Sequence, residues 1–285
     1  MKNLEIIVYN EYDSLGFRND FRIGLRYFNK EHKKEETGEK MKNYKLLIQY
    51  DGGRYKGWQR LGNGDQSIQG KIENVLTEMV GEKIEIIGCS RTDAGVHALS
   101  QVANFKMNKE MTEKEVMNYL NHYLPNDISI SKVAIVPDRF HARYNAKDKT
   151  YVYKIWNKSY TNPFMRKYSM HVEKKLNVKR MEQAAAYFVG KHDFTAFSNA
   201  KSKKKSMVKE IYSIDIKEVE GFLEIRVSGD GFLYNMVRKI VGTLIEIGLG
   251  KIEADAIPAI IAEKDRSLTG MMAEANGLFL EKVQF

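Results

Sequence analysis

The chain has 285 residues, of which 43% are hydrophobic and 29% charged, the composition of an ordinary globular protein. This length supports one large domain or two modest ones. No apolar run approaches the ~20 residues that span a membrane, and the first residues lack the apolar core of a secretory signal. The single cysteine, Cys89, excludes an intrachain disulfide and is typical of a reducing compartment. We therefore expect a cytoplasmic protein without membrane segments.

The formal net charge of the chain is +9. Residues 1–40 contain as many acidic as basic side chains, so the whole excess lies in residues 41–285. A basic body of this size favours a polyanionic partner such as nucleic acid. Charge alone is equally compatible with a basic protein that binds no polyanion.

Residues 1–40 are predicted to be an accessory N-terminal extension, whose role the sequence does not reveal. Residues 30–40 are almost all polar, as in a solvated linker. Met41 then opens a segment that resembles a fresh start, so translation from an upstream start codon is an alternative origin of the extension.

Residues 44–136 show the periodicity of alternating strands and helices. Ile68, Ile72 and Val75 recur at helical spacing, and Thr112 with Glu115 forms a capping box that predicts the start of a second helix. Strands are predicted over 44–50, 84–89, 101–107 and 128–136, and helices over 67–80 and 112–123. The resulting order, β-α-β-β-α-β, is that of a split ferredoxin-like unit.

Residues 151–284 repeat this order of elements. Strands are predicted over 151–156, 211–219, 222–228 and 278–284, and helices over 178–189, 233–248 and 254–262, with a hairpin at Glu220-Gly221. We therefore predict an α+β fold of two ferredoxin-like (RRM-like) halves. Their mainly antiparallel sheets would form a central platform, with a basic cleft between the halves. The expected domains are residues 41–145, which hold the loop described next, and residues 146–285.

Residues 88–98 (GCSRTDAGVHA) form the most informative loop of the sequence. They follow an apolar run predicted to be a buried strand, and glycines near both ends free the backbone. Asp93 lies two residues after Arg91. Because the loop follows the end of the predicted strand, the Asp93 carboxylate would be accessible rather than buried. The commoner role of an isolated aspartate near glycines is to form a turn or to cap a helix.

Six segments resemble, in the same order, the motifs of the tRNA pseudouridine synthase A (TruA) family. One such block is weak evidence, whereas six in order are specific. The blocks are 50–60 (YDGGRYKGWQR), 88–102, 140–153, 190–197 (GKHDFTAF), 232–244 (FLYNMVRKIVGTL) and 275–280 (ANGLFL), within a match that covers residues 44–285. Cys89-Ser90 departs from the usual small residue before Arg91, and the segment after Phe197 is rich in lysine.

The resemblance implies an isomerase that converts uridine to pseudouridine at positions 38, 39 and 40 of the tRNA anticodon stem-loop, acting as a homodimer. It implies that Asp93 is the nucleophile, that Tyr151 stacks on the target uracil and that Arg238 pairs with the nucleophile. It also implies that Leu278 lines the base pocket and that Arg91 helps to evict the target nucleotide. The reaction gains and loses no atoms, so neither a cofactor nor a metal is expected, and the histidines show no metal-ligand spacing.

These roles are chemically reasonable, although each residue type has a commoner one. Arg238 falls at the edge of an apolar helical face, where most arginines are surface residues. Tyr151 shares a strand face with Tyr153, where core packing is usual. A guanidinium would keep the carboxylate of Asp93 ionised in a dry site. Attack at C1′ of the ribose, attack at C6 of the uracil and a glycal route all stay open.

Basic residues interleaved with aromatic ones predict further RNA contacts at Arg54, Lys56 and Arg60. The lysines of residues 201–209 are as compatible with an arm that grips phosphates as with a solvated loop.

Two other classes of protein stay open on the residues alone. A noncatalytic RNA-binding module would explain the charge and the aromatic residues, but it would not need Asp93 and Arg238 together. A carboxylate-dependent glycosidase would break the same bond, but it usually needs two neighbouring acids, and this loop offers one.

Overall fold

A computed structural model describes residues 6–9, 22–25, 41–60, 62, 66–199 and 206–285. The chain divides into two compact units, Met1–Glu39 and Lys40–Phe285. In the first unit, strand β1 (Ile6–Tyr9) pairs antiparallel with β2 (Arg22–Leu25).

The second unit contains both strands and helices. Its strands are β3 (Lys42–Tyr50), β4 (Ile87–Gly88), β5 (His97–Met107), β6 (Ile128–Val136), β7 (Asp148–Trp156), β8 (Met170–His171), β9 (Gly190–Asp193), β10 (Val208–Val219), β11 (Phe222–Gly229) and β12 (Leu278–Gln284). Its α-helices are α1 (Ile68–Val80), α2 (Glu113–Tyr123), α3 (Val178–Ala186), α4 (Met236–Gly248) and α5 (Ile257–Glu263). Its short 3₁₀ helices are η1 (Ala254–Ala256), η2 (Arg266–Leu268) and η3 (Ala275–Gly277).

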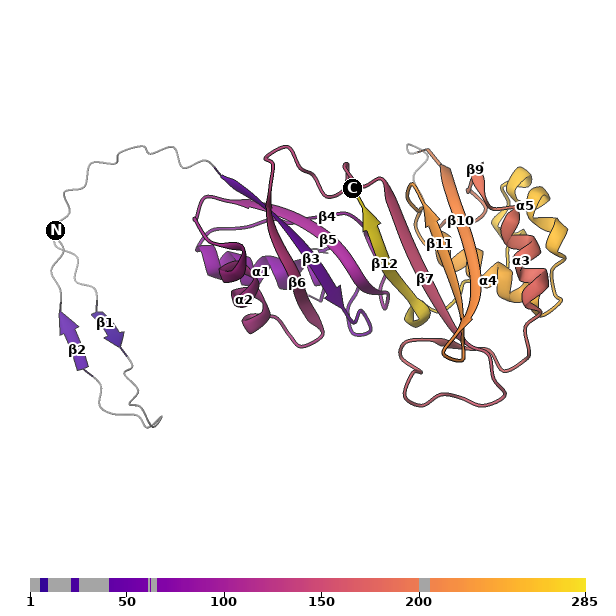
Figure 1. The fold of residues 1–285 in the computed structure, drawn as a ribbon, viewed down its shortest axis with the longest axis horizontal. Helices are drawn as coiled ribbons and strands as arrows, with labels where there is room; N and C mark the ends of the chain where they lie inside the picture. The colour runs from indigo at the N-terminus through magenta and orange to yellow at the C-terminus, as the bar shows by residue number, and fades with distance from the viewer. Residues whose placement is uncertain (1–5, 10–21, 26–40, 61, 63–65, 200–205) are drawn as a thin grey trace. The chain divides into compact units, whose positions relative to one another are not determined.

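The strands form one sheet in the order β6-β3-β5-β12-β7-β11-β10-β9, with β4 beside β5 and β8 beside β7 (Figure 1). Among the described residues, every strand pairing is antiparallel except β5 with β12 and β7 with β8. The last strand, β12, lies between β5 and β7 and so joins the strands of residues 41–145 to those of residues 146–285. The predicted α+β class with a mostly antiparallel sheet is confirmed. The expected domain boundary at residue 145 falls in the connection between β6 and β7 and stays a prediction.

Helices accompany both ends of this sheet. Figure 1 shows α1 and α2 beside the β3–β6 end, and α3, α4 and α5 beside the β9–β11 end. On β3, alternate side chains of Tyr44, Leu46 and Ile48 are fully buried, whereas the intervening ones are partly exposed. This period of two is that of a sheet with one face against the core. Within the described residues, no helix is long and apolar enough to cross a membrane.

Local sequence features correctly located several element boundaries. The Ser67 hydroxyl accepts from the Gly70 N–H at the start of α1, and Thr112 forms the predicted capping box with Glu115 at the start of α2. The hairpin between β10 and β11 turns at Glu220-Gly221, where both residues have positive φ. Such a two-residue turn matches the twist of the flanking strands.

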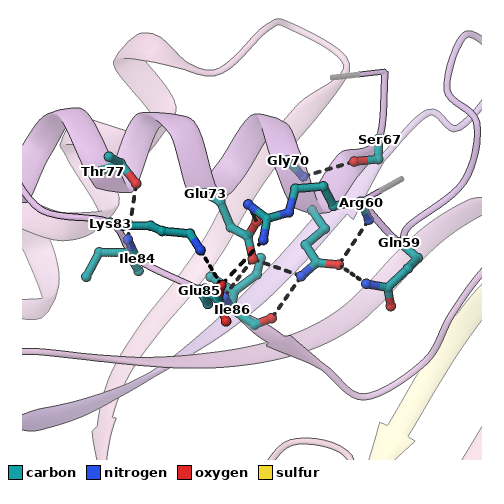
Figure 2. Close-up of polar contacts among 11 residues, drawn as sticks. Gln59, Arg60, Ser67, Gly70, Glu73, Thr77, Lys83, Ile84, Glu85 and Ile86 are labelled. Atoms are coloured by element: carbon teal, nitrogen blue, oxygen red, sulfur yellow. Dashed lines mark hydrogen bonds and ion pairs between the residues drawn. The ribbon is translucent and has the colours of Figure 1, made fainter. Parts of the chain in front are cut away.

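Three predicted elements are shorter than expected, and one of them is the helix over 178–189, which ends at Ala186. The strand over 84–89 is reduced to Ile87–Gly88. Side chains of α1 take the backbone donors that a longer strand would use, because the Ile84 N–H donates to Thr77 and the Ile86 N–H donates to Glu73 (Figure 2). The helix over 233–248 begins only at Met236, since Asn235 adopts the left-handed conformation with φ 62°.

Candidate active site

A cavity of about 900 Å³ lies between the two groups of strands. The loop before β5 forms one wall, and the segment between β11 and α4 forms another. Five residues singled out from the sequence line it: Arg91, Asp93, Tyr151, Arg238 and Leu278. Residues that are up to 187 positions apart in the chain therefore face one space large enough for a nucleotide.

The end of β3 and the segment that follows it, residues 50–58, contact the loop that carries Asp93. The Trp58 N–H donates to the Thr92 carbonyl at 3.1 Å, and the hydroxyls of Tyr50 and Thr92 lie 2.7 Å apart. Gly57, with φ +99°, lies so close to the loop that a Cβ there would be 2.6 Å from the Thr92 oxygen. Trp58 is buried. These contacts make the 50–58 segment a support for the Asp93 loop.

Gly57→Ala is therefore expected to cost about 3 kcal/mol of stability, since the new methyl group meets backbone and the residue must keep a positive φ. It should also lower turnover, because the Asp93 loop must move. Gly81→Ala is the matched control. Gly81 has φ +83° but open space around its missing Cβ, so we expect a loss of about 1 kcal/mol and full activity. Equal effects of the two changes in urea unfolding would contradict this view of the loop.

Asp93 and Arg238 meet inside the cavity. The Nη1 atom of Arg238 lies 3.9 Å from Oδ2 of Asp93, and the two side chains are 12% and 15% exposed. The guanidinium is anchored by its Nε–H, which donates to the Ala273 carbonyl at 2.8 Å. Nη1 also lies 3.4 Å from the side-chain oxygen of Asn235. Helix α4 thus brings a fixed cation to the carboxylate, at ion-pair rather than hydrogen-bond distance.

Burial raises the pKa of Asp93 from 3.8 to about 6, and the charge of Arg238 offsets part of this rise. Desolvation is the larger effect because the carboxylate accepts few hydrogen bonds while water is largely excluded. At neutral pH the group is still mostly ionised. The result is a poorly solvated carboxylate at the cavity wall, the state that suits a nucleophile or a base.

Tyr151 and Leu278 supply apolar surface beside this pair. The Tyr151 hydroxyl lies 2.7 Å from the Ser90 hydroxyl, and its ring meets Phe232 edge-on with 5.3 Å between centroids. Burial raises the pKa of Tyr151 well above its usual value, so the phenol stays protonated. Tyr153, on the same strand face, is fully buried and donates to the Glu274 carbonyl. Only the first of these two tyrosines lines the cavity.

Arg54, Lys56 and Arg60 do not line this cavity. The Arg54 side chain forms an ion pair with Asp127, and most of it is exposed. Lys56 is exposed as well, and its backbone N–H donates to the Gln66 carbonyl. Their contact with RNA stays a prediction.

Arg60 belongs to a network around a buried carboxylate, which Figure 2 shows. Oε1 of Glu73 accepts from the Gln69 amide and from the Ile86 N–H. Its other oxygen lies 3.3 Å from Nη1 of Arg60, while Nη2 of Arg60 is 3.5 Å from Glu85. Because Glu73 is 2% exposed, Arg60 is the charge that compensates its burial.

Arg60→Met should therefore reduce stability by about 2 kcal/mol, because it leaves a buried carboxylate without its cation. The affinity for tRNA of the folded variant should change by less than about twofold. Lys83→Met is the control, since Lys83 and Glu85 form an exposed pair whose loss should barely change stability. A large loss of tRNA affinity with unchanged stability would instead support the predicted RNA contact.

Several residues that line the cavity were not predicted from the sequence as site residues. They are Ser90, Arg143, Tyr144, Lys149, Asp230 and Phe232. Lys149 is two positions before Tyr151, so the period of a strand could have placed both on one face. Lys209, the last of the lysines of 201–209, also lines the cavity from β10, whereas residues 201–205 lie outside the described residues.

Comparisons with known proteins identify the family. A family model described as tRNA pseudouridine synthase matches residues 46–145 and 184–285. The chain belongs to the tRNA pseudouridine synthase family. It is 69% identical over 245 residues to tRNA pseudouridine synthase A 2 of Bacillus cereus, covering 86% of this chain and all of that protein. It is 45% identical, with the same coverage, to tRNA pseudouridine synthase A of Acetivibrio thermocellus.

Membership of the tRNA pseudouridine synthase family makes this chain an isomerase enzyme. In the described part of the synthase, no group of three or more His, Cys, Asp and Glu side chains is arranged to hold a metal ion. Cys89 is buried, and burial raises the pKa of its thiol, which disfavours the reactive thiolate.

Proposed function

We propose that this synthase converts uridine to pseudouridine at positions 38, 39 and 40 of the tRNA anticodon stem-loop, with Asp93 as the nucleophile. The observation that carries the proposal is the pairing of Asp93 with Arg238 inside a cavity of about 900 Å³. A noncatalytic RNA-binding module has no need of a desolvated carboxylate matched to a fixed guanidinium.

Each residue of the proposed site has a role that follows from its position. Tyr151 offers its ring to the extruded uracil, and stacking of this kind is worth ~1–3 kcal/mol per base. Leu278 supplies apolar surface to the same base. Arg238 keeps Asp93 ionised in spite of its burial. Arg91, exposed at the rim, would hold the strand while the nucleotide leaves its stack.

The reaction balances without an external reactant. The N1–C1′ bond of uridine breaks, the uracil turns, and a C5–C1′ bond forms; C5 loses its proton and N1 gains one. One carboxylate can serve by attacking C1′ of the ribose, by attacking C6 of the uracil, or by removing a sugar proton in a glycal route. All three routes need Asp93 ionised, so they share the pH dependence expected below.

The proposal also covers the domain architecture, the oligomeric state and the cellular location. Within each half, the strand order is that of a ferredoxin-like unit: β6-β3-β5-β4 in the first and β12-β7-β11-β10 in the second. We take residues 41–145 and 146–285 as the two domains on this basis. Homodimer formation, which the family resemblance implies, and a cytoplasmic location, which the single cysteine favours, complete the proposal.

The decisive experiment has two arms. Pseudouridine is mapped in tRNA from cells that lack the protein, where positions 38–40 should carry unmodified uridine. Purified enzyme is then incubated with tRNA tritiated at C5 of uridine, where tritium should be released in step with pseudouridine. Release of free uracil would indicate a glycosidase instead, and tRNA binding without tritium release would indicate a binding module.

A further inference from the structure

Four basic side chains line one wall of the cavity beside Tyr151. They are Arg91 from the loop before β5, Arg143 from the connection between β6 and β7, Lys149 from β7, and Lys209 from β10. We call these four residues the cationic wall. Arg143, Lys149 and Lys209 are partly buried, so they are not ordinary solvated surface charges.

No ion pair among the described residues joins the cationic wall to a carboxylate. The Nζ atom of Lys149 donates to the Cys89 carbonyl at 2.8 Å, which leaves two of its three donors for another partner. Asp230 also lines the cavity, but its Oδ1 accepts from the Glu210 N–H at 3.1 Å. The carboxylate of Asp93 lies beside Arg238.

The four cations are close enough to affect one another. Burial lowers the pKa of Arg143, and the charge of Arg91 lowers it further. Burial likewise lowers the pKa of Lys149, and the charges of Arg143 and Lys209 lower it further, whereas Cys89 and the carboxylate of Asp230 oppose this shift. Desolvated like charges destabilise the folded protein unless an anion enters between them. Asp230 compensates part of this charge at Lys149, and the positive charge that remains on the wall favours an anionic ligand.

We propose that the cationic wall binds the phosphodiesters on either side of the nucleotide whose base stacks on Tyr151. The proposal rests on the proposed function, which it deepens by naming the part of the substrate that these residues hold. Lys149 and Tyr151 lie on the same face of β7, about 7 Å apart along the strand. A nucleotide likewise presents a base and, one ribose away, its phosphates. Backbone phosphates carry no sequence information, so the wall contributes affinity and register rather than base choice.

Binding without turnover gives the first test. In an Asp93→Asn background, Arg143→Gln and Lys209→Gln are each expected to weaken binding of unmodified tRNA by about tenfold. Each should also reduce the slope of log Kd against log salt by about 0.7–0.9, the value for one phosphate contact. Lys132→Gln, an exposed lysine on β6, is the matched control and should change neither quantity. Arg143→Lys should restore most of the slope.

A thermodynamic cycle that combines a protein substitution with a neutral RNA linkage locates the phosphate contacts. Neutral methylphosphonates are placed one at a time along an anticodon stem-loop RNA. Next to the nucleotide that enters the cavity, the substitution should weaken binding to the parent protein about tenfold but add little to the loss in Arg143→Gln. At distant positions, the loss of affinity caused by the methylphosphonate and the loss caused by Arg143→Gln should multiply. Multiplicative losses at every position, or an unchanged salt slope in both Arg143→Gln and Lys209→Gln, would overturn the proposal.

These readouts separate the two proposals. Coupling between a methylphosphonate and Arg143→Gln would support the cationic wall even if wild-type protein formed no pseudouridine. Normal pseudouridine formation together with wild-type salt slopes in the variants would refute the wall and leave the proposed function intact. Thermal unfolding of each variant shows that it is folded, and Lys209→Gln, at a partly exposed position, provides the test if Arg143→Gln unfolds.

Discussion

Asp93→Asn is expected to lower pseudouridine formation by three orders of magnitude or more while the protein still folds and binds tRNA. The amide keeps the size of the side chain but removes the charge that attacks or abstracts a proton, and loss of a nucleophile of this kind has such effects. Single-turnover kinetics measure the loss, and filter binding measures retained tRNA affinity. Turnover at the wild-type rate would end the assignment of Asp93.

The same change is expected to stabilise the protein. The folded-state pKa of Asp93 is about 6 and its reference value 3.8, so the ionised carboxylate is disfavoured by up to about 3 kcal/mol in the folded state. This destabilisation is fully present above pH 6 and disappears as the pH falls toward 3.8. Asp93→Asn should therefore gain about 1–3 kcal/mol at pH 7.5 and much less at pH 4.5.

Urea unfolding at the two pH values measures this gain. Asp215→Asn, an exposed position on β10, is the control and should change neither stability nor activity. A less stable Asp93→Asn protein at pH 7.5 would show that Arg238 stabilises the carboxylate more than burial destabilises it.

The rate of pseudouridine formation is expected to rise about tenfold between pH 5 and pH 7, with a midpoint near 6. The rise follows ionisation of Asp93, whose pKa is about 6 because burial outweighs the attraction of Arg238. Arg238→Gln removes the factor that lowers this pKa, so the midpoint should move to higher pH while the maximal rate falls. For Arg238→Lys, both the midpoint and the maximal rate should lie between those of the wild-type enzyme and those of Arg238→Gln.

Single-turnover rates at saturating enzyme give the profile without interference from product release. Lys239→Gln is the matched control, because Lys239 is the next cation on α4 but donates to the Gly270 carbonyl and does not line the cavity. It should leave the midpoint in place. A flat profile from pH 5 to pH 7, or an unmoved midpoint in Arg238→Gln, would show that Asp93 does not control the rate.

Local sequence features predicted most of the fold. The capping box at Thr112, the hairpin at Glu220-Gly221 and the apolar period of α1 each act within a few residues, so the chain reveals them directly. The strand expected over 84–89 was wrong over most of its length, because Glu73 and Thr77 of α1 take its backbone donors. Such competition depends on a helix and a strand meeting, which a local pattern does not contain.

The residues of the candidate site also divide into those that the sequence identified and those whose partners only the fold decided. The loop of Asp93 was recognisable from its own residues, and the resemblance supplied Arg238, Tyr151 and Leu278 as partners. Arg54 and Arg60 matched a pattern of basic and aromatic residues typical of RNA contacts, yet in the fold they form ion pairs with Asp127 and Glu73. Charge in a sequence does not indicate which carboxylate will lie beside it.

The amino-acid sequence by itself therefore determined the α+β class, the net positive charge, the family and the identity of the proposed nucleophile. Each of these depends on composition or on short contiguous motifs. Tertiary structure alone decided which cations are paired and which face the cavity. It also set the desolvation that raises the pKa of Asp93 and brought together Arg143, Lys149 and Lys209. The physical reason is that solvent exclusion and charge pairing depend on distances between segments remote in the chain.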